Sequence, residues 1–366
     1  MVKPVRVLEL ITVPADFNGL TRFPMRLMAK MDPSAVRADL LTYAVGDERI
    51  RGEIEAMGAR LYVAPHRLKR PLSYMRFVAS LVRENRYDIV HLHGNSCTLA
   101  IDLWAAKRGG ARVRIAHSHN TACKFTLLHR LLRPAFDALY THAYACGDEA
   151  GRWLFGRKPF RIIPNAVDAE ALAFSEPARA DVRAEFGLKD EPVLGHVGNF
   201  VPAKNPLFLM EVLNRLPECR LLLAGDGPMR AEVEARSAEM GLSGRVIFAG
   251  ARGDMPRLYS AMDALLLPSL FEGFPTVALE SQCAGLPTIL SEAVTRDCAL
   301  TDFAAFEPLD AERWAARIRE GLGQNRAQLS AEGRSAVVKA GYDLTHLATD
   351  LQAEYLRLVR SGKPQR

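Results

Sequence analysis

The feature that most constrains the fold is an alternation of short apolar runs with amphipathic segments, which occurs twice along the chain. Such runs predict strands at residues 5–13, 38–45, 61–64, 89–93, 113–117 and 143–146, and again at 193–198, 220–224, 246–249, 264–267, 288–291 and 305–307. Between them, helical patterns cover residues 20–31, 49–57, 72–85, 98–107 and 147–155, then 206–216, 229–240, 254–261, 275–284, 311–324, 327–339 and 344–359. Because helices that alternate with strands cover both faces of a parallel sheet, we predict an α/β chain of two tandem, doubly wound, Rossmann-like domains.

The chain length supports two domains, since 366 residues are too many for one hydrophobic core. Residues 160–168 open with a strand and end the first pattern, and residues 169–180 lack a clear apolar period, which indicates a hinge. We therefore expect domains at residues 1–168 and 169–343, followed by a helical segment at 344–366. Ligands of doubly wound sheets bind outside the carboxyl ends of the strands, so the default site is a cleft between the domains.

Composition excludes several classes of protein. The 49% of hydrophobic and 25% of charged residues are ordinary for a soluble protein, and no apolar run approaches the roughly 20 residues that span a bilayer. The apolar N-terminal stretch contains Glu9 and lacks a small-residue cleavage site, so it predicts a buried strand and not a signal peptide. The six cysteines form no CxxC pair and no metal-ligand spacing, which favours reduced thiols in a cytoplasmic protein.

The charge is divided unequally between the two halves. Residues 1–165 carry 26 Lys and Arg against 14 Asp and Glu, a net charge of +12, whereas residues 166–366 carry 22 against 28, a net charge of −6. A basic first half indicates an anionic partner for that half.

The stretch from Leu265 to Glu280 reads as a strand, a tight turn and a helix that opens at Pro275. Proline suits the first helical position, where its missing N–H would have no intrahelical partner. The N–H groups of Gly273, Phe274 and Thr276, together with the helix dipole, then form an anion site that suits a phosphate.

Two glutamates frame this turn, and each can be a solvated surface group or a ligand-binding group. Glu272 precedes the turn, and Glu280 lies five residues into the helix, about 7.5 Å along its axis. A ribose lies at about that distance from a bound pyrophosphate, and a carboxylate can accept two hydrogen bonds from a vicinal diol. Because Glu280 lies among Val277, Ala278 and Leu279, we favour binding over solvation.

Three other turns carry weaker signals. Lys204, in the segment Gly195–Lys204, lies at a predicted helix start, where it is either a solvated lysine or a positive charge for a pyrophosphate. Gly225-Asp226-Gly227 fits a plain turn in which Asp226 forms a cap. Gly19, after the first strand, lets the backbone approach a phosphate closely.

Two histidines end a strand of the first half, in the segment Ala116-His117-Ser118-His119. An imidazole there can hydrogen-bond a polar substrate or move a proton, although structural histidines are more common. We favour a functional role for His119 and a structural role for His117.

Taken together along the chain, these turns, glutamates and histidines resemble those of the retaining GT-B glycosyltransferases of the group-1 family (glycosyltransferase family 4). The resemblance covers nearly the whole chain and is most specific at residues 195–204 and 267–287, where PSLFEGFPTVALESQCAGLP carries the two glutamates of the family with seven residues between them. The HLHG and AHSHNT segments look like the branch that builds capsular polysaccharide and exopolysaccharide. The resemblance implies a GT-B fold with an interdomain cleft and a C-terminal helix that packs back on the first domain.

The resemblance also implies the ligand and the site residues. The donor would be a nucleotide-diphosphate sugar, a UDP-sugar or GDP-sugar, held mainly by the second domain. In the second domain, Lys204 would contact the pyrophosphate and Glu280 the ribose. Glu272, together with Gly273, Phe274 and Pro275, would contact the sugar and its phosphate. Ala251 and Arg252 would contact the base. In the first domain, His119 would contact the donor sugar and Gly19 the pyrophosphate.

The chain departs from the family pattern at two positions. Asn199 stands where many members have arginine, which removes one of two charges that clamp the phosphates. Asn18 stands beside Gly19 where many members have a glycine pair.

The implied reaction is hexosyl transfer with retention of configuration, in the EC 2.4 class, to a saccharide or polyprenyl-linked acceptor. Lys204 and the helix start would replace a metal ion, and the absence of an Asp-x-Asp motif agrees, so no metal or other cofactor is expected. Alternatives are a nucleotide-sugar epimerase of the same fold and a non-catalytic glycosyltransferase-like subunit.

Basic residues of the first half are the last feature. They are Arg67, Lys69, Arg70, Arg76, Arg83, Arg86, Arg130 and Arg133. They are either solvated charges or a peripheral contact with the anionic inner face of the membrane, where a basic residue can contribute about 1 kcal/mol. No aromatic residues alternate with these arginines, so nucleic acid is not expected as a partner.

Overall fold

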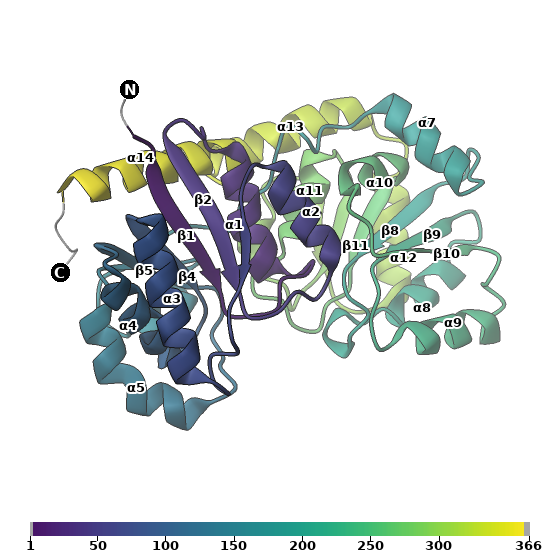
Figure 1. Cartoon of the computed structure of the whole chain (residues 1–366). Coiled ribbons are helices and arrows are strands. Elements are labelled where there is room, and N and C mark those ends of the chain that lie inside the picture. Colours follow the sequence, from purple (N-terminus) through teal and green to yellow (C-terminus); the bar gives the residue numbers. More distant parts are fainter. Residues whose placement is uncertain (1–2, 362–366) are drawn as a thin grey trace. The chain divides into compact units, whose positions relative to one another are not determined.

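The computed structural model describes residues 3–361. The chain divides into two compact units, which are Met1–Asn165 with Leu344–Arg366 (unit 1) and Ala166–Asp343 (unit 2). Each unit is a parallel sheet with helices on it (Figure 1). Every strand predicted from the sequence is present, which confirms the doubly wound α/β fold.

Unit 1 contains a parallel sheet with the strand order β3-β2-β1-β4-β5-β6-β7. The strands are β1 (Val5–Ile11), β2 (Val36–Thr42), β3 (Leu61–Val63), β4 (Ile89–His93), β5 (Val113–Ser118), β6 (His142–Ala145) and β7 (Arg161–Ile162). The chain runs outward from β1 in one direction and from β4 in the other. The switch point of the sheet, where ligands of such folds bind, therefore lies between β1 and β4.

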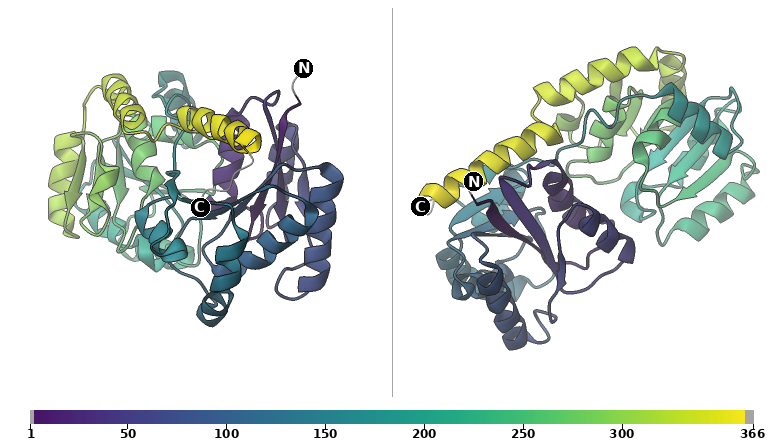
Figure 2. Two further views of the ribbon diagram at one scale, coloured as in Figure 1. Left: turned by 90° about the vertical axis from the view of Figure 1, so that its left-hand side faces the viewer. Right: turned by 45° about the horizontal axis from the view of Figure 1, so that its top comes forward.

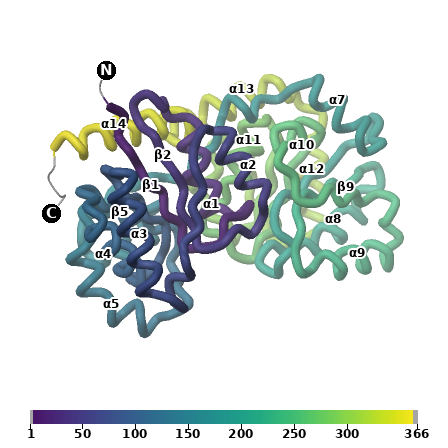
Figure 3. The backbone as a smooth tube through the Cα atoms, viewed as in Figure 1, coloured from purple at the N-terminus to yellow at the C-terminus, as the bar shows by residue number. Residues whose placement is uncertain are grey.

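The helices of unit 1 cover both faces of this sheet. They are α1 (Gly19–Lys30), α2 (Glu48–Ala56), α3 (Pro71–Asn85), the 3₁₀ turn η1 (Cys97–Leu99), α4 (Ala100–Gly109), α5 (Thr126–Leu139), α6 (Asp148–Phe155) and the C-terminal α14 (Leu344–Ser361). Leu8 and Leu10 of β1 pack into a core with α3 and α4, whereas Ile11 packs with α1 and α2 on the other face. Helix α14 lies beside α1 and also contacts β1 and β2 (Figures 2 and 3).

Unit 2 contains a parallel sheet with the strand order β10-β9-β8-β11-β12-β13. Its strands are β8 (Val193–Val197), β9 (Arg220–Ala224), β10 (Val246–Gly250), β11 (Ala264–Leu267), β12 (Thr288–Ser291) and β13 (Ala304–Glu307). Its helices are α7 (Glu176–Glu185), η2 (Pro202–Lys204), α8 (Phe208–Asn214), α9 (Arg230–Glu239), α10 (Met255–Ala261), α11 (Thr276–Cys283), η3 (Arg296–Cys298), α12 (Ala311–Gly321) and α13 (Arg326–Lys339). The switch point of this sheet lies between β8 and β11.

Three expectations about helices were wrong. Helix α5 was not predicted; it contains Pro134 and begins without a side-chain cap. Helix α7 lies partly in the expected hinge, where Ser175 caps it by accepting a hydrogen bond from the Ala178 N–H at 3.3 Å. Lys204 does not begin an α-helix, because it ends the 3₁₀ turn η2 and α8 starts only at Phe208.

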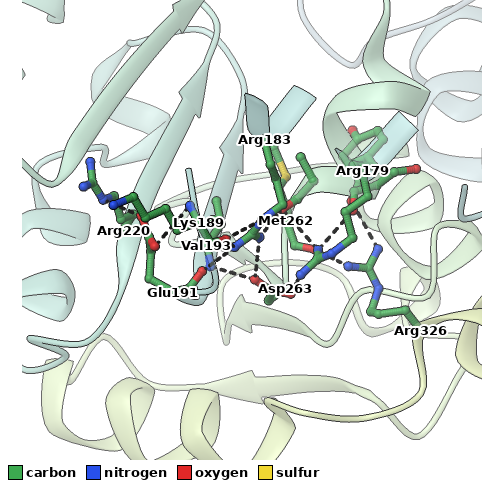
Figure 4. A network of polar contacts seen from close by, with 12 residues as sticks. Arg179, Arg183, Lys189, Glu191, Val193, Arg220, Met262, Asp263 and Arg326 are labelled. Carbon is green, nitrogen blue, oxygen red and sulfur yellow. Dashed lines mark hydrogen bonds and ion pairs between the residues drawn. The ribbon is translucent and has the colours of Figure 1, made fainter. Parts of the chain in front are cut away.

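Three arginines hold the end of α10 and the start of β11 (Figure 4). Arg179 donates to the carbonyl oxygens of Ser260, Ala261 and Met262 at 3.2–3.3 Å, Arg183 donates to that of Ala261 at 3.0 Å, and Arg326 donates to those of Tyr259 and Met262. The carboxylate of Asp263 pairs with Arg179 at 2.7 Å and accepts the Val193 N–H at 2.8 Å. These bonds satisfy the last carbonyls of α10 and fix β11 beside β8.

Candidate functional site

The site in unit 2 is built around an ion pair between Lys204 and Glu272. Lys204 follows β8, and Glu272 follows β11, so the pair lies at the carboxyl ends of the two strands that flank the switch point. Each side chain is 19% exposed, and the Ser269 hydroxyl lies 3.4 Å from the same Glu272 oxygen. The Leu270 N–H donates to the Ala203 carbonyl at 2.8 Å, which ties the two loops together. The fold therefore brings two of the predicted site residues into direct contact.

Glu280 lies in α11 and is 7% exposed. Helix α11 begins at Thr276, with Pro275 as its N-cap residue, so the helix starts one residue later than predicted. The hydroxyl of Tyr259, on α10, donates a hydrogen bond to Glu280 at 2.8 Å. Sequence reasoning missed Tyr259, since no local pattern marks a tyrosine in α10 as the partner of a carboxylate in α11.

The turn between β11 and α11 is exposed at Gly273, while the neighbouring Phe274 is half-buried and stacks on Tyr342 with ring centroids 5.0 Å apart. The first N–H groups of a helix have no intrahelical acceptor, and they carry the positive end of the helix dipole. Only the short segment Gly273–Pro275 separates this end of α11 from Glu272, so a negative carboxylate and a positive helix end lie close together in the chain.

The loop after β8, which carries the exposed Asn199, is supported by the turn after β9. A Cβ at Gly225 would overlap the carbonyl oxygen of Gly198, and a Cβ at Gly227 would lie 2.6 Å from the carbonyl oxygen of Phe200. The carboxylate of Asp226 accepts the Gly227 N–H at 2.8 Å, but it does not cap α9, whose N-cap residue is Met229 and has no side-chain cap. The two glycines therefore let the backbone of the turn after β9 pack closely against the loop that carries Asn199.

Arg252, predicted with Ala251 to contact the base, already has partners within unit 2. It pairs with Glu185 at 2.6 Å and with Asp254 at 2.8 Å, and its guanidinium lies over the ring of Phe186. Ala251 is exposed after β10. Contact of these two residues with a base stays a prediction.

The predicted residues of unit 1 lie near the carboxyl ends of β1 and β5. Gly19 is the first residue of α1, and the Asn18 side chain caps this helix by accepting the Thr21 N–H at 2.9 Å. His119 follows β5, and its Nε2 lies 2.9 Å from Nδ1 of His93. His117 is fully buried.

Sequence reasoning missed the partners of these histidines. Glu9, His91, His93 and Tyr355 surround His117 and His119 in a buried polar cluster. Among residues 3–361, nitrogens of His91, His93 and His117 lie within 4.8 Å of one another, so these three could hold a metal ion. The signal in the sequence that could have revealed this cluster is a charged or imidazole side chain at every second position of strands that are otherwise apolar.

One of the basic residues is not on the surface. Arg67 is buried, pairs with the fully buried Asp102 at 2.9 Å and donates to Thr98 Oγ1 at 2.6 Å. Its inclusion among surface charges was wrong, because a polar partner on α4 draws it inward. Six other basic residues are exposed, namely Lys69, Arg70, Arg76, Arg83, Arg86 and Arg130.

Comparison with known proteins decides the family. Residues 17–171 match the model of Glycosyltransferase Family 4, and residues 178–336 match that of Glycosyl transferases group 1. The chain is 34% identical over 349 residues to EpsF of Bacillus subtilis (strain 168), covering 89% of this chain and 90% of EpsF. The chain belongs to the group-1 glycosyltransferases. It is also 31% identical over 241 residues to an Escherichia coli UDP-Gal:alpha-D-GlcNAc-diphosphoundecaprenol alpha-1,3-galactosyltransferase, covering 61% of that protein.

Solved structures show that the fold of this glycosyltransferase is GT-B. HepE of Anabaena, crystallised with UDP, aligns with a TM-score of 0.78 at 19% identity, covering 96% of this chain and all of that one. WaaG, a glycosyltransferase involved in lipopolysaccharide biosynthesis, aligns with a TM-score of 0.64 at 20% identity over 96% of this chain and 99% of that one. In the described part of this chain, no helix is both long and apolar enough to cross a bilayer.

Proposed function

We propose that this glycosyltransferase moves a hexosyl group from a nucleotide-diphosphate sugar to a saccharide or polyprenyl-linked acceptor, with retention of configuration, in exopolysaccharide synthesis. The observation that carries the proposal is the meeting of Lys204 and Glu272 at the switch point of unit 2, next to the start of α11. A cation on the loop after β8, together with a partly exposed carboxylate and a helix N-terminus after β11, suits a sugar diphosphate.

The donor roles follow from this arrangement. Without ligand, the Lys204 ammonium pairs with Glu272. A bound pyrophosphate competes for that ammonium and leaves the Glu272 carboxylate to accept hydrogen bonds from sugar hydroxyls. Glu280, oriented by Tyr259, would accept the ribose hydroxyls. Gly273 and Phe274 would offer backbone N–H groups to the phosphate.

The chemical step needs stabilisation of the departing nucleoside diphosphate. The bond between the anomeric carbon and the phosphate oxygen breaks while the acceptor oxygen bonds to the same carbon from the same face. The departing phosphate oxygen takes the acceptor proton, so the step requires neither a protein nucleophile nor a protein base. Lys204 and the N-terminus of α11 stabilise the negative charge as it grows on the leaving group.

Unit 1 would supply the remaining donor contacts and bind the acceptor. His119 would contact the donor sugar, and Gly19, exposed at the start of α1, would approach the pyrophosphate. A polyprenyl-linked acceptor is supported by the Escherichia coli relative, whose name specifies a diphosphoundecaprenol acceptor. The same name specifies a UDP-sugar donor, so UDP is the first base to test.

The proposal predicts that UDP and one UDP-sugar stabilise the protein, since a ligand at 100 times its Kd adds about 2.7 kcal/mol. Thermal shift over UDP, GDP, ADP and their sugars measures this effect. NMR of the product made from the stabilising sugar should show an anomeric configuration equal to that of the donor. An inverted product would refute retention, and conversion of the donor to an epimer without acceptor would refute transfer.

Helix α5 and the basic residues beside it support a membrane contact of unit 1. Leu127 and Leu131 are 71% and 67% exposed, and Phe125, just before the helix, is 48% exposed. Lys124 and Arg130 are exposed beside them. An apolar stripe flanked by cations is typical of helices that lie in the interface of an anionic bilayer. We therefore place the membrane contact of unit 1 at α5, with an undecaprenyl-type acceptor within reach.

This contact predicts salt-sensitive co-sedimentation with vesicles that contain anionic lipid. The double variant Leu127→Asp/Leu131→Asp should bind such vesicles about tenfold more weakly or worse, since it removes two apolar anchors. Val338→Asp, which changes a 40% exposed residue of unit 2, is the matched control and should bind as the unchanged protein does. Equal binding to neutral and anionic vesicles at all salt concentrations would contradict the prediction.

A further inference from the structure

Register in the sheet of unit 1 brings four ionisable side chains onto one face. Glu9 of β1 pairs in register with His91 of β4, Ile11 pairs with His93, and His93 pairs with His117 of β5. Residues two apart on a strand share a face, so Glu9, His91, His93 and His117 gather on the side covered by α1 and α14. All four are at most 3% exposed. Tyr355 of α14 closes the cluster, and Phe23 of α1 packs edge-on against His119 at 4.9 Å.

One proton assignment satisfies the branch that leads to His119. A neutral imidazole has one N–H donor and one bare acceptor nitrogen. His93 Nε2 lies 2.7 Å from Glu9 Oε2, and because a carboxylate only accepts, Nε2 carries the proton. His93 Nδ1 is then bare and accepts from His119 Nε2 at 2.9 Å. His119 is thereby protonated at Nε2, and its Nδ1 is an acceptor.

The second branch stabilises the same carboxylate. Tyr355 donates to Glu9 Oε1 at 3.1 Å, His91 Nδ1 donates to the Tyr355 oxygen at 2.6 Å, and His117 Nδ1 donates to His91 Nε2 at 3.1 Å. In this direction the buried His117 Nε2 has no hydrogen-bond partner. If every donor and acceptor of this branch is exchanged, His117 Nε2 still has no partner, and the hydrogen bond from Tyr355 to Glu9 is lost as well. The stated direction therefore keeps one more bond to a charged group, and such bonds are the strong ones.

The electrostatics agree with neutral imidazoles at His93 and His119 beside an ionised Glu9. Burial, together with the neighbouring imidazole of His91, lowers the pKa of His93 to about 4. Burial and His93 hold the pKa of His119 well below its usual value. Burial alone would raise the pKa of Glu9, but attraction to and hydrogen bonds from His91 and His93 bring it below its ordinary value. At neutral pH, the ionised Glu9 is thus an acceptor at both oxygens.

We propose that Glu9 and His93 are positioning residues that set the tautomer of His119, so that its Nδ1 accepts a hydrogen bond from a hydroxyl of the donor sugar. Hydrogen bonds occupy both ring nitrogens of His91 and both of His93, so a metal ion held there would have to break at least one of them at each residue. The inference rests on the proposed function, because His119 needs a sugar to act on. It adds two residues that sequence reasoning did not assign.

The first test reads the tautomer and needs no activity. Long-range ¹H–¹⁵N NMR of the histidine-labelled full chain should show His119 protonated at Nε2. In Glu9→Gln, the amide can turn its N–H toward His93 Nε2, and this orientation moves the His93 proton to Nδ1 and the His119 proton to Nδ1. Asp39→Asn, which neutralises another buried carboxylate of unit 1 (7% exposed), is the matched control and should leave the His119 tautomer unchanged. His119 protonated at Nδ1 in the unchanged protein would overturn the proposal.

The second test reads transfer. Glu9→Gln should lower kcat/KM for sugar transfer by about 10- to 100-fold, the loss known for groups that orient metal-bound histidines, while its affinity for UDP stays unchanged. His93→Asn, whose amide oxygen can accept from His119 in place of Nδ1, should retain more activity than His93→Ala. Adding Glu9→Gln to His93→Asn should then cost nothing further.

Three outcomes would overturn the proposal. The first is full activity of Glu9→Gln when His119→Ala is impaired. The second is an equal loss of activity in His93→Asn and His93→Ala. The third is a stoichiometric metal ion in the purified protein whose removal abolishes transfer. Absence of transfer in the unchanged protein would refute the proposed function instead, and the NMR result would still stand.

Discussion

Replacing Lys204 with alanine is expected to lower kcat for sugar transfer by about 10²- to 10³-fold, the usual cost of removing one preorganised group that stabilises transition-state charge. Lys204 is the cation paired with Glu272 at the switch point of unit 2, and it is 19% exposed. Asn199, on the same loop after β8, is uncharged and supplies no second positive charge that could share the loss. Steady-state kinetics with the donor identified by thermal shift measure the effect.

Two companion variants sharpen this test. Glu272→Gln removes the partner that holds the ammonium in the free protein, so UDP should bind at least as tightly while transfer falls. Lys204→Ala should weaken the binding of UDP as well as transfer. Lys339→Ala, at an exposed lysine of α13, is the matched control and should behave as the unchanged protein. Near-normal transfer by Lys204→Ala would remove the basis of the proposed donor site.

Replacing Arg67 with methionine is expected to lower the free energy of unfolding of unit 1 by about 3–5 kcal/mol, because the change leaves a buried charge without its partner. Asp102 is fully buried, and its carboxylate pairs with Arg67 at 2.9 Å and accepts a hydrogen bond from the Tyr74 hydroxyl. Burial raises the pKa of Asp102, and the Arg67 charge opposes that rise. Equilibrium unfolding in urea, followed by probes in unit 1, measures the loss.

The pH dependence of the Arg67 variant gives a check with a definite sign. Without Arg67, the folded-state pKa of Asp102 rises further above its unfolded value, so the folded state binds the proton more tightly than the unfolded state does. The destabilisation is therefore largest above the raised pKa and shrinks as the pH falls through it. Arg67→Met combined with Asp102→Leu should recover much of the stability, because no lone charge remains. Arg76→Met, at an exposed arginine of α3, should change the stability by less than about 0.5 kcal/mol. A loss below 1 kcal/mol for Arg67→Met would show that the pair is not an essential part of the core.

The two helices that escaped prediction did so for different reasons. Helix α5 has an apolar face, in which Leu132, Phe136 and Leu139 pack on the core of unit 1, so its periodic pattern was present in the sequence. Helix α7 buries only Val182 and Arg183, which leaves little apolar surface for a periodic signal.

The amino-acid sequence by itself determined the doubly wound fold, the family, the turn that carries Glu272 and Gly273, and the helix that carries Glu280. These properties depend on residues that are neighbours in the chain, where apolar runs, glycine turns and helix starts leave local patterns. Only the tertiary structure decided that Lys204 pairs with Glu272, that Tyr259 holds Glu280 and that Glu9 and His93 stand behind His119. Those partners lie on separate elements, and strand register and helix packing, which no local pattern encodes, bring their polar atoms within hydrogen-bond distance.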